Sequence, residues 1–268
     1  MFDWIKTMKT ILEHIGNTPL VKIESLDDGD QANIFAKIEG MNPGGSIKDR
    51  IVLKMINDAE ARGALKKGDT IVEPTSGNTG VALAMIGAMK GYKVKLVMPK
   101  TTSADKIKII TAFGGGVILI ENEKFGKVAI EKIKERALKD EHLVFLNQYE
   151  NEMNPLVHYT KTAEEIINQM QGLTIDFFVA GMGTGGTITG NSSKLKEEYP
   201  GIKIIGVQPK EGQIIEGLRS LKSFVPAVVN LTMVDKVIEL DSEKALEARK
   251  YLAVNKGILA GPSSGAAF

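Results

Sequence analysis

The stretch DFFVAGMGTGGTITG, residues 176–190, passes from an apolar segment through a glycine-rich turn into a helical pattern. This order is typical of a strand of a parallel sheet that is followed directly by a helix. In such a turn the glycines let backbone N–H groups approach an anion closely, the threonine hydroxyls add donors, and the helix N-terminus contributes partial positive charge. The stretch therefore predicts an α/β fold with a turn suited to a phosphate group.

The same alternation of apolar segments and helical periodicity continues along the 268 residues of the chain. Strands are predicted at residues 34–38, 70–72, 94–98, 117–120, 143–146, 177–180, 204–207 and 237–240. Helices are predicted at residues 48–61, 78–90, 103–113, 127–138, 162–170, 187–198 and 242–256. Gly91 and Gly114 stand where glycines commonly end helices. Strands that alternate with helices in this way indicate parallel sheets wrapped by helices.

The predicted elements suggest more than one domain. Residues 76–148 contain three strands and three helices, which is enough for a small lobe with its own sheet. We expect residues 46–148 to form a smaller substrate-binding domain, and residues 1–45 with 149–268 to form a larger cofactor domain. In that arrangement the chain crosses between the domains more than once.

Composition excludes several classes of function. Lys and Arg total 34 against 33 Asp and Glu, and no basic block is present, so a nucleic-acid partner is not expected. No apolar run reaches the roughly 20 residues of a membrane span, and we expect a cytoplasmic protein. The chain has no cysteine, which excludes disulfides and thiolate metal sites. Its three histidines, His14, His142 and His158, have no ligand spacing, so no metal is expected.

Lys48 is the first candidate for chemistry, because of its place in NPGGSIKDR, residues 42–50. Residues 42–45 have the composition of a turn, Ser46 is a candidate N-cap, and Lys48 then falls in the first helical turn. A desolvated lysine amine forms Schiff bases with carbonyl compounds and acts as a base. The alternative is that Lys48 is one more solvated lysine.

A second candidate site is PTSGNTG, residues 74–80, which follows a predicted strand and opens a helix. It supplies hydroxyl groups, a glycine that permits close approach, and a side-chain amide, in Thr75, Ser76, Gly77, Asn78 and Thr79. A helix N-terminus of this kind binds a small carboxylate. The alternative is an ordinary N-capping cluster, because Ser and Thr are common caps.

The glycine-rich turn also has alternatives. Gly181, Gly183 and Gly186 match the dinucleotide pattern G-x-G-x-x-G, which needs an acidic residue at the end of the next strand. Gln208 and Pro209 stand there instead, so nicotinamide binding is a minor alternative. The other is a purely structural turn.

As a set, IGNTPL (residues 15–20), NPGGSIKDR, EPTSGNTG, GTGGTITG and GPSSGA closely resemble, in order and spacing, the cysteine synthases (O-acetylserine sulfhydrylases). These are fold-type II pyridoxal-phosphate enzymes, similar in fold to the tryptophan synthase β-subunit. The resemblance runs from residue 15 to the end of the chain. It implies two three-layer α/β lobes with mostly parallel sheets, and pyridoxal 5′-phosphate in the cleft between them.

The resemblance also implies roles for individual residues. Lys48 would carry the cofactor and act as the base, Asn78 would bind its ring hydroxyl, and Ser263 of GPSSG would face the pyridine nitrogen. The phosphate would be held by Gly183, Thr184, Gly185, Gly186 and Thr187. The substrate carboxylate would be bound by Thr75, Ser76, Gly77, Thr79 and Gln148. Since a neutral hydroxyl makes the ring a weaker electron sink than a carboxylate does, Ser263 favours prompt β-elimination.

The reaction implied is β-replacement through an aminoacrylate, with sulfide converting O-acetylserine or O-phosphoserine into L-cysteine. Residues 208–226, QPKEGQIIEGLRSLKSFVP, resemble the B-type enzymes. In some of these an arginine at the position of Arg219 favours O-phosphoserine, and a guanidinium pairs well with a phosphate. The alternative is that Arg219 is a surface residue or a salt-bridge partner.

The sequence leaves the partners and the exact activity open. The resemblance implies a homodimer and admits serine acetyltransferase as a partner. Activity of the cystathionine β-synthase or serine dehydratase type is an alternative. The family pattern continues beyond Phe268, so a truncated, non-catalytic cofactor binder or regulatory partner is another.

Overall fold

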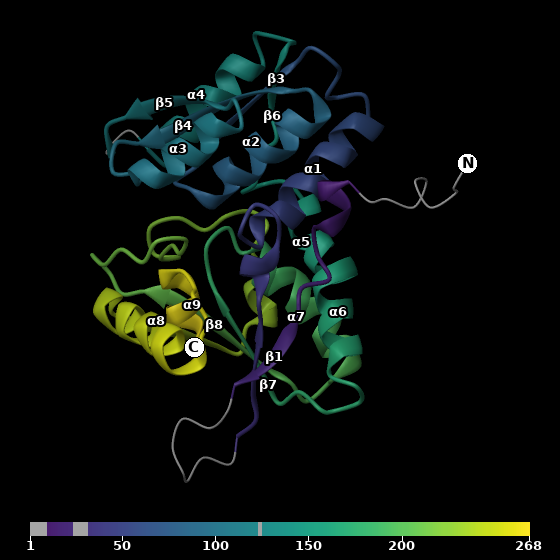
Figure 1. The fold of residues 1–268 in the computed structure, drawn as a ribbon, viewed down its shortest axis with the longest axis vertical. Coiled ribbons are helices and arrows are strands. Elements are labelled where there is room, and N and C mark those ends of the chain that lie inside the picture. Colours follow the sequence, from purple (N-terminus) through teal and green to yellow (C-terminus); the bar gives the residue numbers. More distant parts are fainter. Residues whose placement is uncertain (1–9, 24–31, 123–124) are drawn as a thin grey trace. The chain divides into compact units, whose positions relative to one another are not determined.

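The computed structural model describes residues 10–23, 32–122 and 125–268. The chain forms two compact units, each with a sheet of its own (Figure 1). The first combines the described part of Met1–Thr18 with Glu39–Asn147, and the second combines the described part of Pro19–Ile38 with Gln148–Phe268. The chain therefore crosses between the units more than once. The functional domains expected from the sequence, with residues 46–148 binding substrate, stay a prediction.

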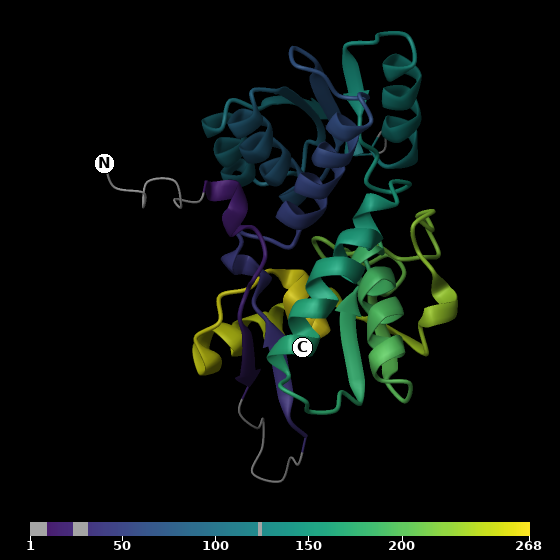
Figure 2. The same ribbon diagram turned by 90° about the vertical axis from the view of Figure 1, so that its right-hand side faces the viewer.

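The first unit is built around a four-stranded parallel sheet in the order β5-β4-β3-β6. Its strands are β3 (Thr70–Pro74), β4 (Lys93–Pro99), β5 (Gly116–Ile120) and β6 (Leu143–Phe145). Its helices are α1 (Lys48–Ala61), α2 (Asn78–Lys90), α3 (Ala104–Ala112) and α4 (Lys127–Ala137), with 3₁₀ turns η2 (Ile11–His14) and η3 (Glu39–Met41). Helix α4 covers one face of the sheet, and α1, α2 and α3 lie on the other (Figure 2).

The strand order of this sheet reverses beside β3. The chain moves from β3 through β4 to β5 and then returns to β6 on the other side of β3. In open α/β sheets, ligands bind at the carboxyl ends of the strands where the order reverses. Residues 75–77 follow β3 at this point and residues 146–147 follow β6. The N–H of Asn147 donates to Oε2 of Glu73 at 3.0 Å, which joins the two strand ends.

The second unit contains a three-stranded parallel sheet, β7-β8-β9, and a separate antiparallel pair, β1-β2. The strands are β1 (Leu20–Ile23), β2 (Ile34–Lys37), β7 (Phe177–Gly181), β8 (Lys203–Pro209) and β9 (Lys236–Leu240). The helical segments are α5 (Met153–Val157), the π-helical turn η5 (His158–Thr162), α6 (Ala163–Gln169), α7 (Gly186–Glu198), η6 (Leu231–Met233), α8 (Ser242–Lys256) and α9 (Pro262–Ala267).

The core of the second unit fixes the turn between β7 and α7. Buried apolar side chains come from α6, from β7 and the residue after it, from α7, and from the region of β8. They are Ala163, Ile166, Met170, Ala180, Met182, Ile188, Leu195, Ile202 and Ile204. Because Met182 and Ile188 lie on either side of the glycine-rich turn and are both buried, the backbone of that turn is anchored at both ends.

The elements agree closely with the sequence patterns. The predicted helices at 48–61, 78–90 and 242–256 coincide with α1, α2 and α8, and every predicted strand overlaps an observed one. The patterns missed β1, which has only four residues, and α5 and α9, which have five and six. The two helices have fewer than two turns each, which is too short to establish a helical period. Within the described residues, no helix is both long and apolar enough to cross a membrane.

Candidate functional site

Lys48 is the first residue of α1 and directly follows a tight turn. The N–H of Gly45 donates to the carbonyl of Asn42 at 2.8 Å, and Gly45 has a φ of +82°, which favours glycine. The Ser46 hydroxyl accepts from the N–H of Lys48 at 3.2 Å. Burial lowers the pKa of Lys48 to about 8. A lysine with a lowered pKa presents the neutral amine that attacks carbonyl groups.

The residue after Lys48 closes the same turn from beneath. Asp49 is fully buried, and its Oδ2 accepts from the N–H of Gly44 at 2.5 Å. A Cβ on Gly44 would lie 2.5 Å from Oδ1 of Asp49, so the turn requires glycine here. Burial, with a smaller contribution from Glu39, raises the pKa of Asp49 to about 6.

Arg50 anchors the first turn of α1 from another direction. Its Nε and Nη2 donate to the two carboxylate oxygens of Glu39 at 2.6 and 2.8 Å. The Thr18 hydroxyl donates to Glu39 Oε1 at 2.6 Å, and Asn42 Nδ2 donates to Oε2 at 2.9 Å. Bidentate Arg–carboxylate pairs fix orientation as well as position. The N–H of Gly16 also donates to Asn42 Oδ1 at 2.8 Å. Two residues of the motif IGNTPL, Gly16 and Thr18, therefore help to hold the turn that precedes Lys48.

The PTSGNTG segment lies at the N-terminus of α2, at the point where the strand order reverses. Residues 75 and 79 are buried, whereas Ser76 and Asn78 are exposed. The N-cap of α2 is Gly77, which has no side chain to cap the helix, and the Thr75 hydroxyl accepts from the N–H of Gly77 at 3.2 Å. The choice between a carboxylate site and a capping cluster stays a prediction. A Cβ on Gly77 would lie 2.7 Å from Nζ of Lys106, so an amine lies against this backbone.

In the second unit, residues 183–187 form the turn that links β7 to α7. Gly185 is the N-cap of α7 and has a φ of +86°. A Cβ on it would collide with Val229, and one on Gly186 would collide with Asn154. A Cβ on Gly183 would lie 2.5 Å from the carbonyl oxygen of Gly217. The packing around the turn therefore requires glycine at these positions. Without side chains, the backbone N–H groups at the helix N-terminus remain accessible to an anion.

The side chains of Asn154 and His158 contact the threonines of this turn. Asn154 Nδ2 donates to Thr184 Oγ1 at 3.0 Å and to the carbonyl of Gln148 at 2.7 Å. Oγ1 of Thr187 lies 3.4 Å from Nε2 of His158. The sequence patterns gave neither residue a supporting role. The only local signal was that Asn154 and His158 are polar residues within a helical, partly apolar stretch.

Ser263 lies in the first turn of α9, next to Gly217. A Cβ on Gly217 would lie 3.3 Å from the Ser263 hydroxyl oxygen. The short helix is supported by α8: Arg249 Nε donates to the carbonyl of Ala260 at 2.9 Å, and Gly265 packs closely against Ala245. The structure therefore brings Ser263 and the glycine-rich turn to either side of one loop residue.

The expected site residues divide between the two units. The first holds Lys48, Thr75, Ser76, Gly77, Asn78 and Thr79. The second holds Gln148, Gly183, Thr184, Gly185, Gly186, Thr187, Arg219 and Ser263. In the described part of the chain, no group of His, Cys, Asp and Glu side chains is arranged to hold a metal ion.

Known proteins resemble the chain over nearly its whole length. A cysteine synthase of Staphylococcus aureus is 44% identical over 271 residues, covering 98% of this chain and 87% of the relative. Cysteine synthase B of Escherichia coli is 42% identical, covering 97% and 86%. The crystal structure of a hydrogen sulfide-producing enzyme from Fusobacterium nucleatum is 40% identical, with a TM-score of 0.91 and coverage of 97% and 90%. The pattern of a family described as pyridoxal-phosphate dependent enzyme matches residues 11–268, and the chain belongs to that family.

Proposed function

We propose that this protein is a cysteine synthase that makes L-cysteine from an O-substituted L-serine and sulfide. In the reaction the Cβ–O bond of the serine derivative breaks, acetate or phosphate leaves, and hydrosulfide forms the new Cβ–S bond. The proposal rests mainly on the position and the pKa of Lys48. Lys48 is the first residue of α1 and follows a hydrogen-bonded turn, and burial lowers the pKa of its amine to about 8.

The residues of both units fit pyridoxal 5′-phosphate. The turn at residues 183–187 leaves no room for side chains at Gly185 and Gly186, as a backbone cradle for a phosphate requires. Lys48 supplies an amine suited to the aldehyde. We assign Asn78 to the ring hydroxyl and Ser263 to the ring nitrogen. When bound, the cofactor supplies a sink for the electrons released when a proton leaves Cα.

The remaining steps belong to the chain's own residues. The backbone and hydroxyls of Thr75, Ser76, Gly77 and Thr79, with Gln148, bind the substrate carboxylate and orient Cα. Lys48 removes the Cα proton once its amine is released by the incoming substrate. A base with a pKa near the working pH is effective in such a transfer. Within this proposal the first unit binds substrate and the second binds the cofactor phosphate.

The donor is O-acetylserine or O-phosphoserine. Arg219 supports the second, because its guanidinium carries the charge that a phosphate leaving group needs. The sequence alternative, a salt-bridge role, has no support in the described residues, where no carboxylate pairs with Arg219. Kinetics with both donors test the choice. Arg219→Ala is expected to reduce turnover of O-phosphoserine more than that of O-acetylserine, and equal losses on both would refute the assignment.

The test of the whole proposal is the absorption spectrum of the purified protein, before and after O-acetylserine is added, together with cysteine formation when sulfide follows. Lys48→Ala is expected to lose the visible absorbance of the lysine-bound cofactor and at least about 10³-fold in turnover. Lys67→Ala, which removes an exposed lysine, is the control. Cofactor absorbance that does not respond to either donor would contradict the proposal and favour a non-catalytic binder.

A second candidate reaction is release of sulfide from cysteine. The similarity to a hydrogen sulfide-producing enzyme favours it. Sulfide formation from cysteine alone, compared with cysteine formation from the donors, decides which direction the protein supports. Homocysteine and unsubstituted serine in the same assays test the cystathionine β-synthase and dehydratase alternatives.

The proposal includes a homodimer in the cytoplasm, as the family resemblance implies. Light scattering tests the dimer, and cell fractionation tests the location. Serine acetyltransferase is the partner that the resemblance admits, and co-elution of the two purified proteins tests it.

A further inference from the structure

Arg219 is a partly buried cation to which the described part of the chain supplies no neutralising carboxylate. Its backbone N–H donates to the carbonyl of Met182 at 2.8 Å, and its Nη2 donates to the hydroxyl of Tyr149 at 3.0 Å. Among the described residues, no Asp or Glu forms an ion pair with it. Buried arginines are normally paired. The positive charge of Arg219 is thus available to pair with an anionic ligand.

Two aromatic rings hold the guanidinium. Its Cζ lies 5.1 Å from the ring centroid of Tyr149 and 5.2 Å from that of Phe224. The two rings meet edge to face at 84°, with centroids 5.7 Å apart, and Tyr149 is buried. Aromatic faces attract a cation without neutralising it. A guanidinium has five N–H donors, and the Tyr149 hydroxyl takes only one.

We call the two rings of Tyr149 and Phe224 around the guanidinium the aromatic cage. The cage and Arg219 are connected to the glycine-rich turn by two sets of hydrogen bonds. Met182, whose carbonyl accepts from Arg219, directly precedes Gly183. Tyr149 directly follows Gln148, whose carbonyl accepts from the same Asn154 amide that bonds Thr184. The hydrogen bond between Arg219 and Tyr149 therefore joins two segments that each contact the glycine-rich turn.

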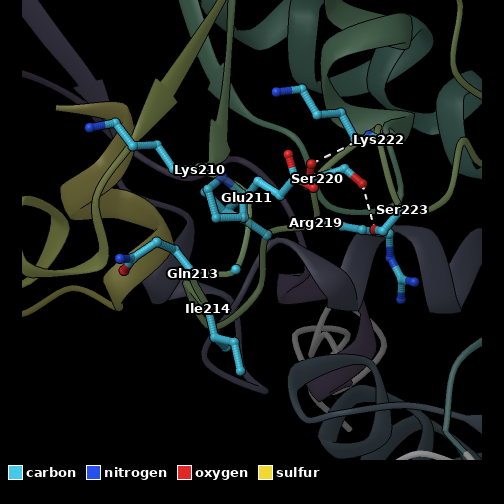
Figure 3. Close-up of a pocket in the computed structure, with 11 residues that line it drawn as sticks. Lys210, Glu211, Gln213, Ile214, Arg219, Ser220, Lys222 and Ser223 are labelled. Carbon is cyan, nitrogen blue, oxygen red and sulfur yellow. Dashed lines mark hydrogen bonds between the residues drawn. The ribbon is translucent and has the colours of Figure 1, made fainter.

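Arg219 also lines a pocket at the loop after β8. This pocket has a volume of about 320 Å³, and Lys210, Gln213 and Lys222 line it as well. Lys210 pairs with Asp241 at 2.6 Å and Lys222 with Glu239 at 2.8 Å, so these cations are neutralised. In Figure 3 the Arg219 guanidinium extends away from the side chains of Lys210 and Gln213.

We propose that Tyr149 and Phe224 are positioning residues that hold the Arg219 guanidinium in one place beside the glycine-rich turn and so set the preference for a donor with an anionic leaving group. This rests on the proposed function. The Tyr149 hydroxyl fixes the rotation of the guanidinium plane, and the two rings fix its position. A ring without the hydroxyl would keep the attraction and lose the orientation.

The experiment compares the wild-type holoenzyme with Tyr149→Phe, Phe224→Leu, Arg219→Ala and the double variant Tyr149→Phe/Arg219→Ala. Tyr159→Phe is the matched control, because it deletes a hydroxyl that contacts exposed Glu197 in the same unit. The measurements are kcat and KM with each donor, cofactor affinity, and calorimetric titration of the holoenzyme with inorganic phosphate.

We expect Tyr149→Phe to raise KM for O-phosphoserine and the Kd for inorganic phosphate by about 3–10-fold, with less than about a twofold change in KM for O-acetylserine. Tyr159→Phe should change none of these. The double variant should equal Arg219→Ala, because Tyr149 acts through Arg219. Equal losses on both donors, additive effects in the double variant, or a change in cofactor affinity alone would each overturn the proposal. If the wild type turns over neither donor, the proposed function fails, and phosphate titration alone decides the role of the cage.

Discussion

Oγ1 of Thr187 lies 3.4 Å from Nε2 of His158, an imidazole with no exposed surface. Nδ1 of the same ring lies 3.0 Å from the hydroxyl of Thr162. His158 and Thr162 are the first and last residues of the π-helical turn η5, a feature that often marks functional sites. One buried ring therefore connects the glycine-rich turn to the start of α6.

The first prediction concerns the hydroxyl of Thr187. Thr187→Val keeps the shape of the side chain, removes a hydroxyl donor to the cofactor phosphate, and removes the contact of Thr187 with Nε2 of His158. We expect the Kd for pyridoxal 5′-phosphate to rise about tenfold. Titration of the apoprotein, followed by absorbance, measures it. Thr160→Val is the control, because the Thr160 hydroxyl donates to the carbonyl of Leu156 in the adjoining helix α5 and not to the glycine-rich turn. An unchanged Kd would show that the hydroxyl does not contact the phosphate.

The second prediction concerns Gly185. Its φ of +86° is strained for any other residue, and a Cβ would collide with Val229. Gly185→Ala is expected to weaken cofactor binding by more than about tenfold and to lower the Tm of the apoprotein. Gly201→Ala is the matched control, since a Cβ there meets no atom within 4 Å. Should both variants bind cofactor equally well, the turn is not the phosphate cradle.

The third prediction concerns the pH dependence of cofactor attachment. Burial lowers the pKa of Lys48 to about 8, and only the neutral amine attacks an aldehyde. The rate at which apoprotein gains the absorbance of the lysine-bound cofactor is expected to rise about tenfold per pH unit up to pH ~8 and then level off. Stopped-flow mixing across pH 6 to 10 measures it. A rate that keeps rising beyond pH ~9 would mean that the Lys48 amine is not desolvated in the apoprotein.

The sequence predicted those parts of the site that depend on neighbouring residues. Lys48 was placed correctly at the start of α1 because a turn, a polar cap and a helical pattern adjoin in one stretch. Gly185 was predicted in the turn between a strand and a helix for the same reason, and the structure makes it the N-cap of α7. The local sequence is enough to predict these positions, because they do not depend on how distant elements pack.

The supporting contacts could not be predicted in this way. Glu39 meets Arg50, His158 meets Thr187, and Arg219 meets Tyr149 across 11, 29 and 70 positions of sequence. No period or motif specifies such pairs, because they arise only when the elements pack. Arg219 illustrates the limit: the sequence left a salt bridge open, whereas the fold surrounds the guanidinium with two aromatic rings.

The last prediction concerns Asp49, the buried neighbour of Lys48. Burial raises its pKa from the usual 3.8 to about 6, so between these values the folded state binds more protons than the unfolded state. Stability contributed by this carboxyl is therefore present at low pH and is lost as pH rises towards 6. Asp49→Asn cannot ionise, and its amide oxygen can still accept from the N–H of Gly44.

We therefore expect Asp49→Asn to have a Tm about 2–4 °C above that of the wild type at pH 8, and no such advantage at pH 4. Differential scanning calorimetry of the apoprotein at both pH values measures the difference. The control is Asp105→Asn on α3, whose carboxylate is exposed. A variant that is less stable than the wild type at pH 8 would mean that the charged carboxylate, through its bond to Gly44 and its attraction to Arg50, stabilises the turn by more than its burial costs.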